Sequence, residues 1–195
     1  MTTKKQVLSL GRNLNRAVFM DRDGVLIKEV NYLSRLEDMK LIPMAAQSIA
    51  KLRAAGFKTI VISNQSAVAR GFLSLSDLGR ITRVLRSDLL KQNSSAKLDA
   101  IYYCPHHPDF DKPCACRKPG IELILKAQKR FKIDLKSSYF IGDTSVDMLA
   151  AKNAGCVPLL VKTGKAGKDG LHKAKPRKVC KNLAVATRWI LSHGK

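Results

Sequence analysis

The chain has 195 residues, of which 45% are hydrophobic, so it can bury a sizeable core without relying on disulfides. No apolar run approaches the length that spans a membrane, which excludes membrane insertion and makes a cytoplasmic protein the expectation. Lys and Arg outnumber Asp and Glu by 36 to 15, and the resulting net charge of +21 would attract anionic ligands.

Apolar runs alternate with segments of helical spacing along the whole chain. This alternation predicts an α/β fold, a doubly wound parallel sheet with right-handed crossovers. Strands are expected near residues 17–21, 58–63, 99–103, 138–142 and 157–161. Helices are expected near residues 45–55, 76–91, 120–131 and 145–154. In the second of these helices a buried face is predicted, formed by Leu78, Ile81, Leu85 and Leu89.

The first predicted strand ends in two carboxylates, Asp21 and Asp23, followed by Gly24. Residues two apart in a strand point the same way, so the two acids can converge, and the glycine lets the chain turn beneath a ligand. A hard cation such as Mg²⁺ would reconcile their crowding and leave positions open for phosphate oxygens. One carboxylate could then attack phosphorus while the other handles a proton.

Polar residues also follow the later strands. Ser63 and Asn64 could hold phosphate oxygens, Lys118 could neutralise a phosphoryl group, and Asp143 would complete the metal site. Asp147 is expected to cap the next helix or to orient Lys118. Clusters at the carboxyl ends of parallel strands meet at one edge of the sheet, so these residues predict a single phosphoryl-transfer site. Pro119 is expected in the first turn of a helix, with Lys118 extended before it.

A second cluster has the spacing of a metal site. Cys104, His106, Cys114 and Cys116 can supply a Cys₃His tetrahedral zinc site, and His107 could replace His106. The odd number of cysteines, five, fits poorly with full disulfide pairing. Four protein ligands leave no open coordination position, so a structural role is expected.

In order along the chain, Asp21-x-Asp23-Gly24, Ser63, Lys118 and Gly142-Asp143-x-x-x-Asp147 resemble the four motifs of the haloacid dehalogenase superfamily of phosphatases. The resemblance implies Asp21 as the nucleophile and Asp23 as the general acid and base. It also implies Mg²⁺ bound by Asp21, the backbone carbonyl of Asp23, and Asp143. The reaction would pass through an aspartyl-phosphate that water hydrolyses.

The Cys/His cluster narrows the resemblance to a zinc-containing branch of the superfamily that acts on heptose 1,7-bisphosphate, at the 7-phosphate, or on histidinol phosphate. In this branch the segment resembling Ser63-Asn64-Gln65 lines the substrate site, and the pair resembling Arg117 and Lys118 contacts the sugar's phosphates. Arg117 and Arg70 suit a ligand with more than one phosphate, which favours the heptose substrate. Histidinol phosphate is the alternative.

Only about twenty residues separate Val25 from Met44, so we expect little or no cap domain. Residues 25–44, 66–74 and 104–117 would then form the rim of the substrate site. We expect one domain over residues 1–195, with basic and mobile ends at about 1–16 and 165–195. A monomer is favoured.

A zinc-stapled nucleic-acid-binding module is the alternative from another functional class, motivated by the net charge and the Cys/His cluster. Aromatic residues make up only 6% of the chain, and the basic residues are not interleaved with a base-stacking motif. Nucleic acid is therefore not the expected main partner.

Overall fold

A six-stranded parallel sheet, with strand order β3-β2-β1-β4-β5-β6, forms the centre of the computed structural model, which describes residues 14–193. Its strands run along β1 (Ala17–Met20), β2 (Lys58–Asn64), β3 (Ala100–Cys104), β4 (Tyr139–Gly142), β5 (Val157–Val161) and β6 (Lys178–Cys180). Every residue of β1 and β4 is buried, as expected for central strands covered on both faces.

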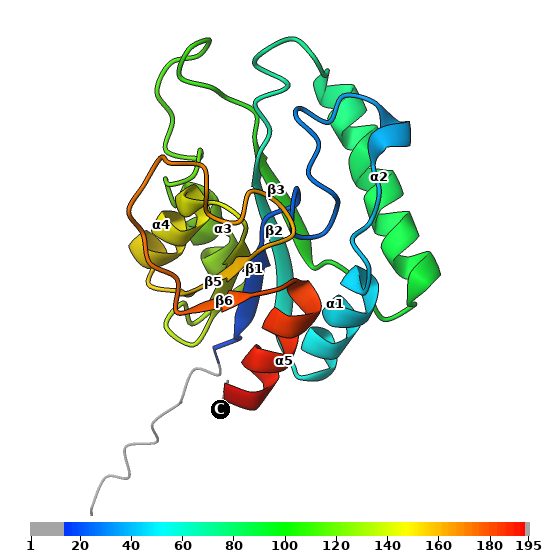
Figure 1. Cartoon of the computed structure of the whole chain (residues 1–195), viewed down its shortest axis with the longest axis vertical. Coiled ribbons are helices and arrows are strands. Elements are labelled where there is room, and N and C mark those ends of the chain that lie inside the picture. The colour runs from blue at the N-terminus through cyan, green and yellow to red at the C-terminus, as the bar shows by residue number, and fades with distance from the viewer. Residues whose placement is uncertain (1–13, 194–195) are drawn as a thin grey trace, which may run out of the picture.

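Helices cover both faces of the sheet (Figure 1). The helices are α1 (Ala45–Ala54), α2 (Leu75–Gln92), α3 (Glu122–Phe131), α4 (Ser145–Ala154) and α5 (Leu183–His193). Helices α1, α2 and α5 pack into one apolar cluster with one face of the sheet, and α3 and α4 pack into a second cluster with the other. The doubly wound α/β fold predicted from the sequence is confirmed.

The predicted strands and helices up to β5 all occur, with ends that differ by one or two residues. The predicted apolar stripe of α2 is buried at each of its four positions. Pro119 is the exception, because α3 begins only at Glu122. The prediction that Pro119 opens the helix was therefore wrong, since the chain first turns at Gly120, whose N–H donates to the Arg117 carbonyl at 2.7 Å.

The C-terminal part of the chain differs most from expectation. The segment from residue 165 onward was predicted to be mobile because it is rich in basic residues and its apolar pattern is short. The structure instead contains β6, paired with β5, and α5, whose buried face comprises Leu183, Ala186, Thr187 and Ile190. Helix α5 packs beside α1 against the sheet (Figure 1), so this segment completes the core. The basic N-terminal residues Lys4, Lys5 and Arg12 lie outside the described residues.

Truncation of Ile190 tests this contribution to the core. Ile190→Ala should lower the free energy of unfolding by about 2–4 kcal/mol, because it removes buried methyl groups and leaves a cavity. The adjacent Leu191 is 41% exposed, so Leu191→Ala is the matched control and should cost less than about 1 kcal/mol. Urea unfolding measures both values. Equal effects would show that α5 does not pack as described.

The loops that follow the strands gather at the upper edge of the sheet in Figure 1. Between Val25 and Met44 the chain forms only a short 3₁₀ helix, Leu36–Asp38, and Ile27 bridges to Leu41 as the loop folds back. No separate cap is present in this segment, as predicted. Within residues 14–193, no helix combines the length and the apolar character needed to cross a membrane.

Candidate active site

Acidic residues from three places in the sequence meet at the carboxyl edge of the sheet. Asp21 follows β1, Asp143 follows β4, and Asp147 lies in the first turn of α4. One carboxylate oxygen from each lies within 4.8 Å of the others. Strands β1 and β4 are neighbours and parallel, which brings their ends together as the sequence predicted.

Lys118 supplies the positive charge at this cluster. Its Nζ donates to Asp147 Oδ1 at 2.6 Å and lies 3.1 Å from Asp21 Oδ1, although the residue is only 4% exposed. Burial opposes the charged form of the lysine, but the carboxylates of Asp147 and Asp21 outweigh this effect and raise the pKa of Lys118. The ammonium group is therefore fixed beside Asp21 in its charged state.

Asp147 performs both of the roles considered for it. It orients Lys118, and its Oδ2 accepts hydrogen bonds from the backbone N–H and the hydroxyl of Thr144, which caps α4. A Cβ atom at Gly142 would collide with the Asp147 side chain, so this close approach requires glycine.

Asn64 holds the backbone on which Lys118 lies. Its Oδ1 accepts from the Lys118 N–H at 2.9 Å, and its Nδ2 donates to the Lys118 carbonyl at 3.1 Å. Asn64 was predicted to contact substrate; it lines the cavity, but its amide group is engaged in positioning Lys118.

Asp143 is almost fully buried beside two backbone loops. Burial and the negative charges of Asp21 and Asp147 raise the pKa of Asp143 to about 8, against the opposing effect of the Lys165 N–H, which donates to its Oδ2 at 2.7 Å. A Cβ atom at either Gly24 or Gly164 would collide with this carboxylate. The site thus concentrates negative charge in a place where water cannot disperse it.

Asp23 faces a different set of partners. Arg22, which is 1% exposed, donates from Nε to Asp23 Oδ2 at 3.1 Å and from a terminal nitrogen to Oδ1 at 3.0 Å. Gln65 Nε2 donates to Asp23 Oδ2 at 2.8 Å and to Ser63 Oγ at 2.9 Å. Ser63 is itself buried, so its predicted contact with phosphate stays a prediction.

The acidic cluster opens into a cavity of about 270 Å³. Its walls include Asp23, Gln65, Tyr32, His107 and Arg117, from the predicted rim segments and the strand ends. Arg117 also donates to the His106 carbonyl at 3.0 Å, which fixes it at the wall. Arg70, predicted to bind substrate, does not line this cavity.

Two parts of the cavity wall were not singled out from the sequence. Glu29 lies in the predicted rim segment 25–44, and burial together with the charge of Asp23 raises the pKa of Glu29 to about 7. The segment after β5 contributes Lys165, Asp169 and Leu171. Asp169 accepts from the Ser145 N–H and hydroxyl, at 2.9 and 2.8 Å, and so holds this segment against α4. The glycine at 164 was the available signal of a close backbone approach.

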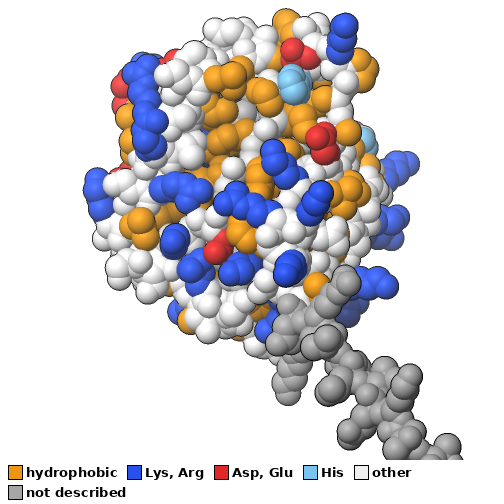
Figure 2. Space-filling model, turned by 180° about the vertical axis from the view of Figure 1, so that it is seen from behind, with side chains coloured by type: hydrophobic (Ala, Val, Ile, Leu, Met, Phe, Trp, Pro, Cys, Tyr) orange, Lys and Arg blue, Asp and Glu red, His pale blue; other side chains and the backbone are white. Residues whose placement is uncertain are grey.

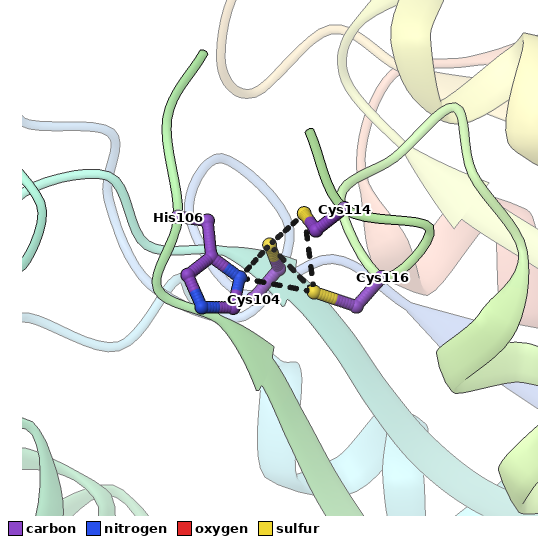
Figure 3. Close-up of side chains that lie close together, drawn as sticks. All are labelled: Cys104, His106, Cys114 and Cys116. Carbon is purple, nitrogen blue, oxygen red and sulfur yellow. Dashed lines mark hydrogen bonds between the residues drawn. The ribbon is translucent and has the colours of Figure 1, made fainter. Parts of the chain in front are cut away.

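The predicted metal cluster is brought together beside the active site. The side chains of Cys104, His106, Cys114 and Cys116 point toward one another from the end of β3 and the loop before α3 (Figure 3). The Sγ–Sγ distances are 3.1, 3.4 and 3.7 Å, and His106 Nδ1 lies 3.4 Å from Cys116 Sγ and 3.8 Å from Cys104 Sγ. Despite partial burial, hydrogen bonds from Cys116 and the Arg117 backbone lower the pKa of Cys114 to about 7.

His107 lies elsewhere. Its Nε2 is 3.2 Å from an Arg70 nitrogen, and its ring packs against Phe110 with centroids 5.8 Å apart. The structure therefore selects His106 over His107 as the histidine of the cluster.

Known proteins resemble the chain over nearly its whole length. A HAD-hydrolase-like family model matches residues 115–186. The chain is 37% identical over 192 residues to D-glycero-D-manno-heptose-1,7-bisphosphate 7-phosphatase of Thermosynechococcus vestitus, covering 91% of this chain and 96% of the relative. It is also 37% identical to D-glycero-beta-D-manno-heptose-1,7-bisphosphate 7-phosphatase of Helicobacter pylori J99, covering 90% of this chain and 97% of that relative.

A relative from Photorhabdus laumondii, named for the alpha form of the substrate, is 41% identical and covers 78% of this chain and 85% of the relative. Among solved structures, D,D-heptose 1,7-bisphosphate phosphatase from B. bronchiseptica, in complex with magnesium and phosphate, superposes with a TM-score of 0.81 at 31% identity. That superposition covers 91% of this chain and 98% of the other.

Proposed function

Because the chain belongs to the D-glycero-D-manno-heptose-1,7-bisphosphate 7-phosphatase family of the haloacid dehalogenase superfamily, we propose that it removes the 7-phosphate of this heptose bisphosphate. It is a phosphoric monoester hydrolase. The observation that carries the proposal is the convergence of Asp21, Lys118 and Asp143 on one cavity.

In the proposed mechanism, an Asp21 carboxylate oxygen attacks the phosphorus of the 7-phosphate. The bond between phosphorus and the sugar oxygen breaks, and Asp23 gives a proton to that oxygen as it leaves. Water then attacks the aspartyl-phosphate, Asp23 takes its proton, and inorganic phosphate is released with Asp21 regenerated. The ammonium of Lys118 offsets negative charge on Asp21 and the phosphoryl oxygens throughout.

The carboxylates fit a magnesium ion. Asp21 and Asp143 present oxygens close together in a site where burial raises the pKa of Asp143 to about 8, and a divalent cation would relieve this crowding. Asp147 is less suited as a ligand because its oxygens are engaged by Lys118 and Thr144. We propose Asp21, Asp143 and the backbone carbonyl of Asp23 as the ligands. When bound, Mg²⁺ would neutralise charge on the transferring phosphoryl group.

The Cys/His cluster fits zinc. A tetrahedral zinc with bonds to sulfur of about 2.3 Å places its sulfur ligands about 3.8 Å apart. The distance between Cys104 and Cys114, 3.7 Å, is close to this value, and the other two, 3.1 and 3.4 Å, are shorter. The pKa of Cys114 is lowered to about 7, whereas burial raises the pKa values of Cys104 and Cys116, so a bound cation would be needed to hold all three as thiolates. We propose a closed structural site of Cys104, His106, Cys114 and Cys116, which fixes the segment leading directly to Arg117 and Lys118.

Loss of the proposed zinc should reach the active site through this segment. We expect Cys116→Ser to lower the zinc content well below one ion per chain and to reduce kcat/KM by about tenfold or more, because Lys118 lies two residues away. Cys156→Ala is the control, since Cys156 is buried outside the cluster. Elemental analysis and phosphate-release assays measure the two effects. A Cys116→Ser variant that loses zinc but keeps full activity would contradict this role.

The remaining features follow from the same assignment. We propose one phosphatase domain over residues 1–195, with Gln65 and Arg117 as substrate contacts. All five cysteines are free, which is consistent with a reducing compartment such as the cytoplasm. The monomeric state stays a prediction.

A substrate panel tests the proposed function. Purified protein is assayed with the alpha and beta anomers of heptose 1,7-bisphosphate, histidinol phosphate and fructose 1,6-bisphosphate, each with and without Mg²⁺. We expect the highest kcat/KM with one heptose anomer and activity that depends on Mg²⁺. A strong preference for histidinol phosphate would overturn the substrate assignment while leaving the phosphatase assignment intact.

A further inference from the structure

Arg70 contacts all the rim segments at once. These segments, residues 25–44, 66–74 and 104–117, are joined in the sequence only through the strands and helices beneath them. The Arg70 guanidinium lies 5.1 Å from the ring of Tyr32 in the first segment and 5.0 Å from the ring of Phe110 in the third. One of its terminal nitrogens lies 3.2 Å from His107 Nε2. A single side chain thus links the first and third segments to its own.

The planar guanidinium suits this position. It can lie against aromatic faces while its N–H groups point outward in the ring plane, and it has only donors, so His107 Nε2 accepts from it. The Arg70 side chain is 23% exposed, and Asp109 Oδ2 lies 3.9 Å away, beyond a direct hydrogen bond. Its closest contacts are those with Tyr32, Phe110 and His107. Among the described residues, the buried Nε of Arg70 has no hydrogen-bond partner.

Tyr32 gives independent support for a linking role. Its φ angle is +54°, in the left-handed region that residues other than glycine rarely adopt. Such a conformation persists where surrounding contacts enforce it. Here the Tyr32 ring packs against Arg70 and, edge to face, against Phe72 with centroids 5.5 Å apart. The half-exposed Tyr32 ring thus contacts two side chains of the second segment, Arg70 and Phe72.

Arg70 also adjoins the cavity wall. Tyr32 and His107 line the cavity that contains Asp21, whereas Arg70 contacts both of them and does not itself line it. A change at Arg70 would therefore reach the substrate through the positions of Tyr32 and His107.

We propose that Arg70 is a positioning residue that holds the rim segments together over the active site and does not bind the substrate's phosphates directly. The effect on catalysis rests on the proposed phosphatase function. The effect on the rim itself does not, because it concerns contacts between side chains of the protein.

The first experiment measures the rim in the substrate-free protein. Hydrogen exchange is followed by mass spectrometry in peptides covering residues 29–35 and 105–112, for wild type, Arg70→Ala and Arg70→Lys. Both variants should exchange about tenfold faster in both peptides, because lysine cannot lie flat between two rings. Arg80→Ala is the matched control, since Arg80 is 63% exposed on α2 and its ion pair within residues 14–193 is with Asp77 at the surface. Unchanged exchange in either peptide would overturn the proposal.

The second experiment separates positioning from charge. With heptose bisphosphate, Arg70→Ala and Arg70→Lys should both raise KM by about tenfold or more, while kcat for p-nitrophenyl phosphate, which is too small to need the rim, stays within about twofold of wild type. If Arg70 bound a phosphate directly, Arg70→Lys would keep most of the wild-type KM and Arg70→Ala would not. That result would overturn the proposal. Failure of wild type to hydrolyse heptose bisphosphate would refute only the proposed substrate.

A second pair of variants covers the case in which the Arg70 variants do not fold. Tyr32→Phe keeps the ring beside Arg70, and Tyr32→Leu removes it. Only Tyr32→Leu should accelerate exchange in the 105–112 peptide, on the opposite side of Arg70. Equal exchange in the two Tyr32 variants would show that the segments are not linked through Arg70.

Discussion

Asp21→Asn is expected to reduce phosphate release by about 10⁴-fold or more while the protein stays folded. The amide keeps the size of the carboxylate but cannot act as the nucleophile that forms the aspartyl-phosphate. It also removes one of the proposed magnesium ligands. Steady-state and single-turnover phosphate release measure the loss, and urea unfolding checks the fold.

The matched control is Asp88→Asn, on the surface of α2, where the carboxylate contacts Lys91 at 3.3 Å. This variant should have wild-type activity. Turnover by Asp21→Asn within about tenfold of wild type would contradict the assignment of the nucleophile and the mechanism that depends on it.

Lys118→Met should have the second largest effect, on activity and on stability together. Loss of the ammonium removes the cation beside Asp21 and should lower kcat by about 10²- to 10³-fold. It also leaves the buried carboxylate of Asp147 without its 2.6 Å partner, which should lower the free energy of unfolding by about 3–5 kcal/mol. Activity assays and urea unfolding measure the two losses.

The double variant Lys118→Met/Asp147→Asn separates these effects. Removing both charges should recover much of the stability, because the amide oxygen introduced in place of the Asp147 carboxylate can still accept from Thr144 at the start of α4 and no buried charge is left unpaired. Activity should stay low. Recovery of activity in the double variant would mean that Lys118 acts mainly by satisfying Asp147.

The high net charge was one reason to consider a nucleic-acid-binding module. Figure 2 shows Lys and Arg side chains over the central and lower part of the face seen from behind, separated by uncharged side chains, with a more apolar area above them. The Cys/His cluster, which motivated that alternative, adjoins the phosphatase cavity through His107 and Arg117. Together with the membership of a phosphatase family, this placement favours a role of the cluster in the enzyme over one in nucleic-acid binding.

The segment after β5 shows why β6 and α5 were not predicted from the sequence. The strand β6 has only three residues, two of them exposed, and its Lys178 and the surrounding basic residues give no alternating pattern. Strand β6 forms because β5 offers a free edge and α5 can cover the sheet beside α1. Both conditions are set by parts of the chain far away in sequence.

The amino-acid sequence alone determined the order of strands and helices up to β5 and the chemistry at their ends, because apolar periodicity and turn residues act over short distances. Asp21, Lys118, Asp143 and the three cysteines of the Cys/His cluster could be predicted in this way. The tertiary structure decided that His106, and not His107, joins the cysteines, and that Asn64 binds the backbone of Lys118. It also decided that Arg70 contacts residues of the cavity wall. Each of these depends on distances of a few ångströms between residues that are separated in the chain or differ only in the direction of one side chain, and no local pattern encodes such distances.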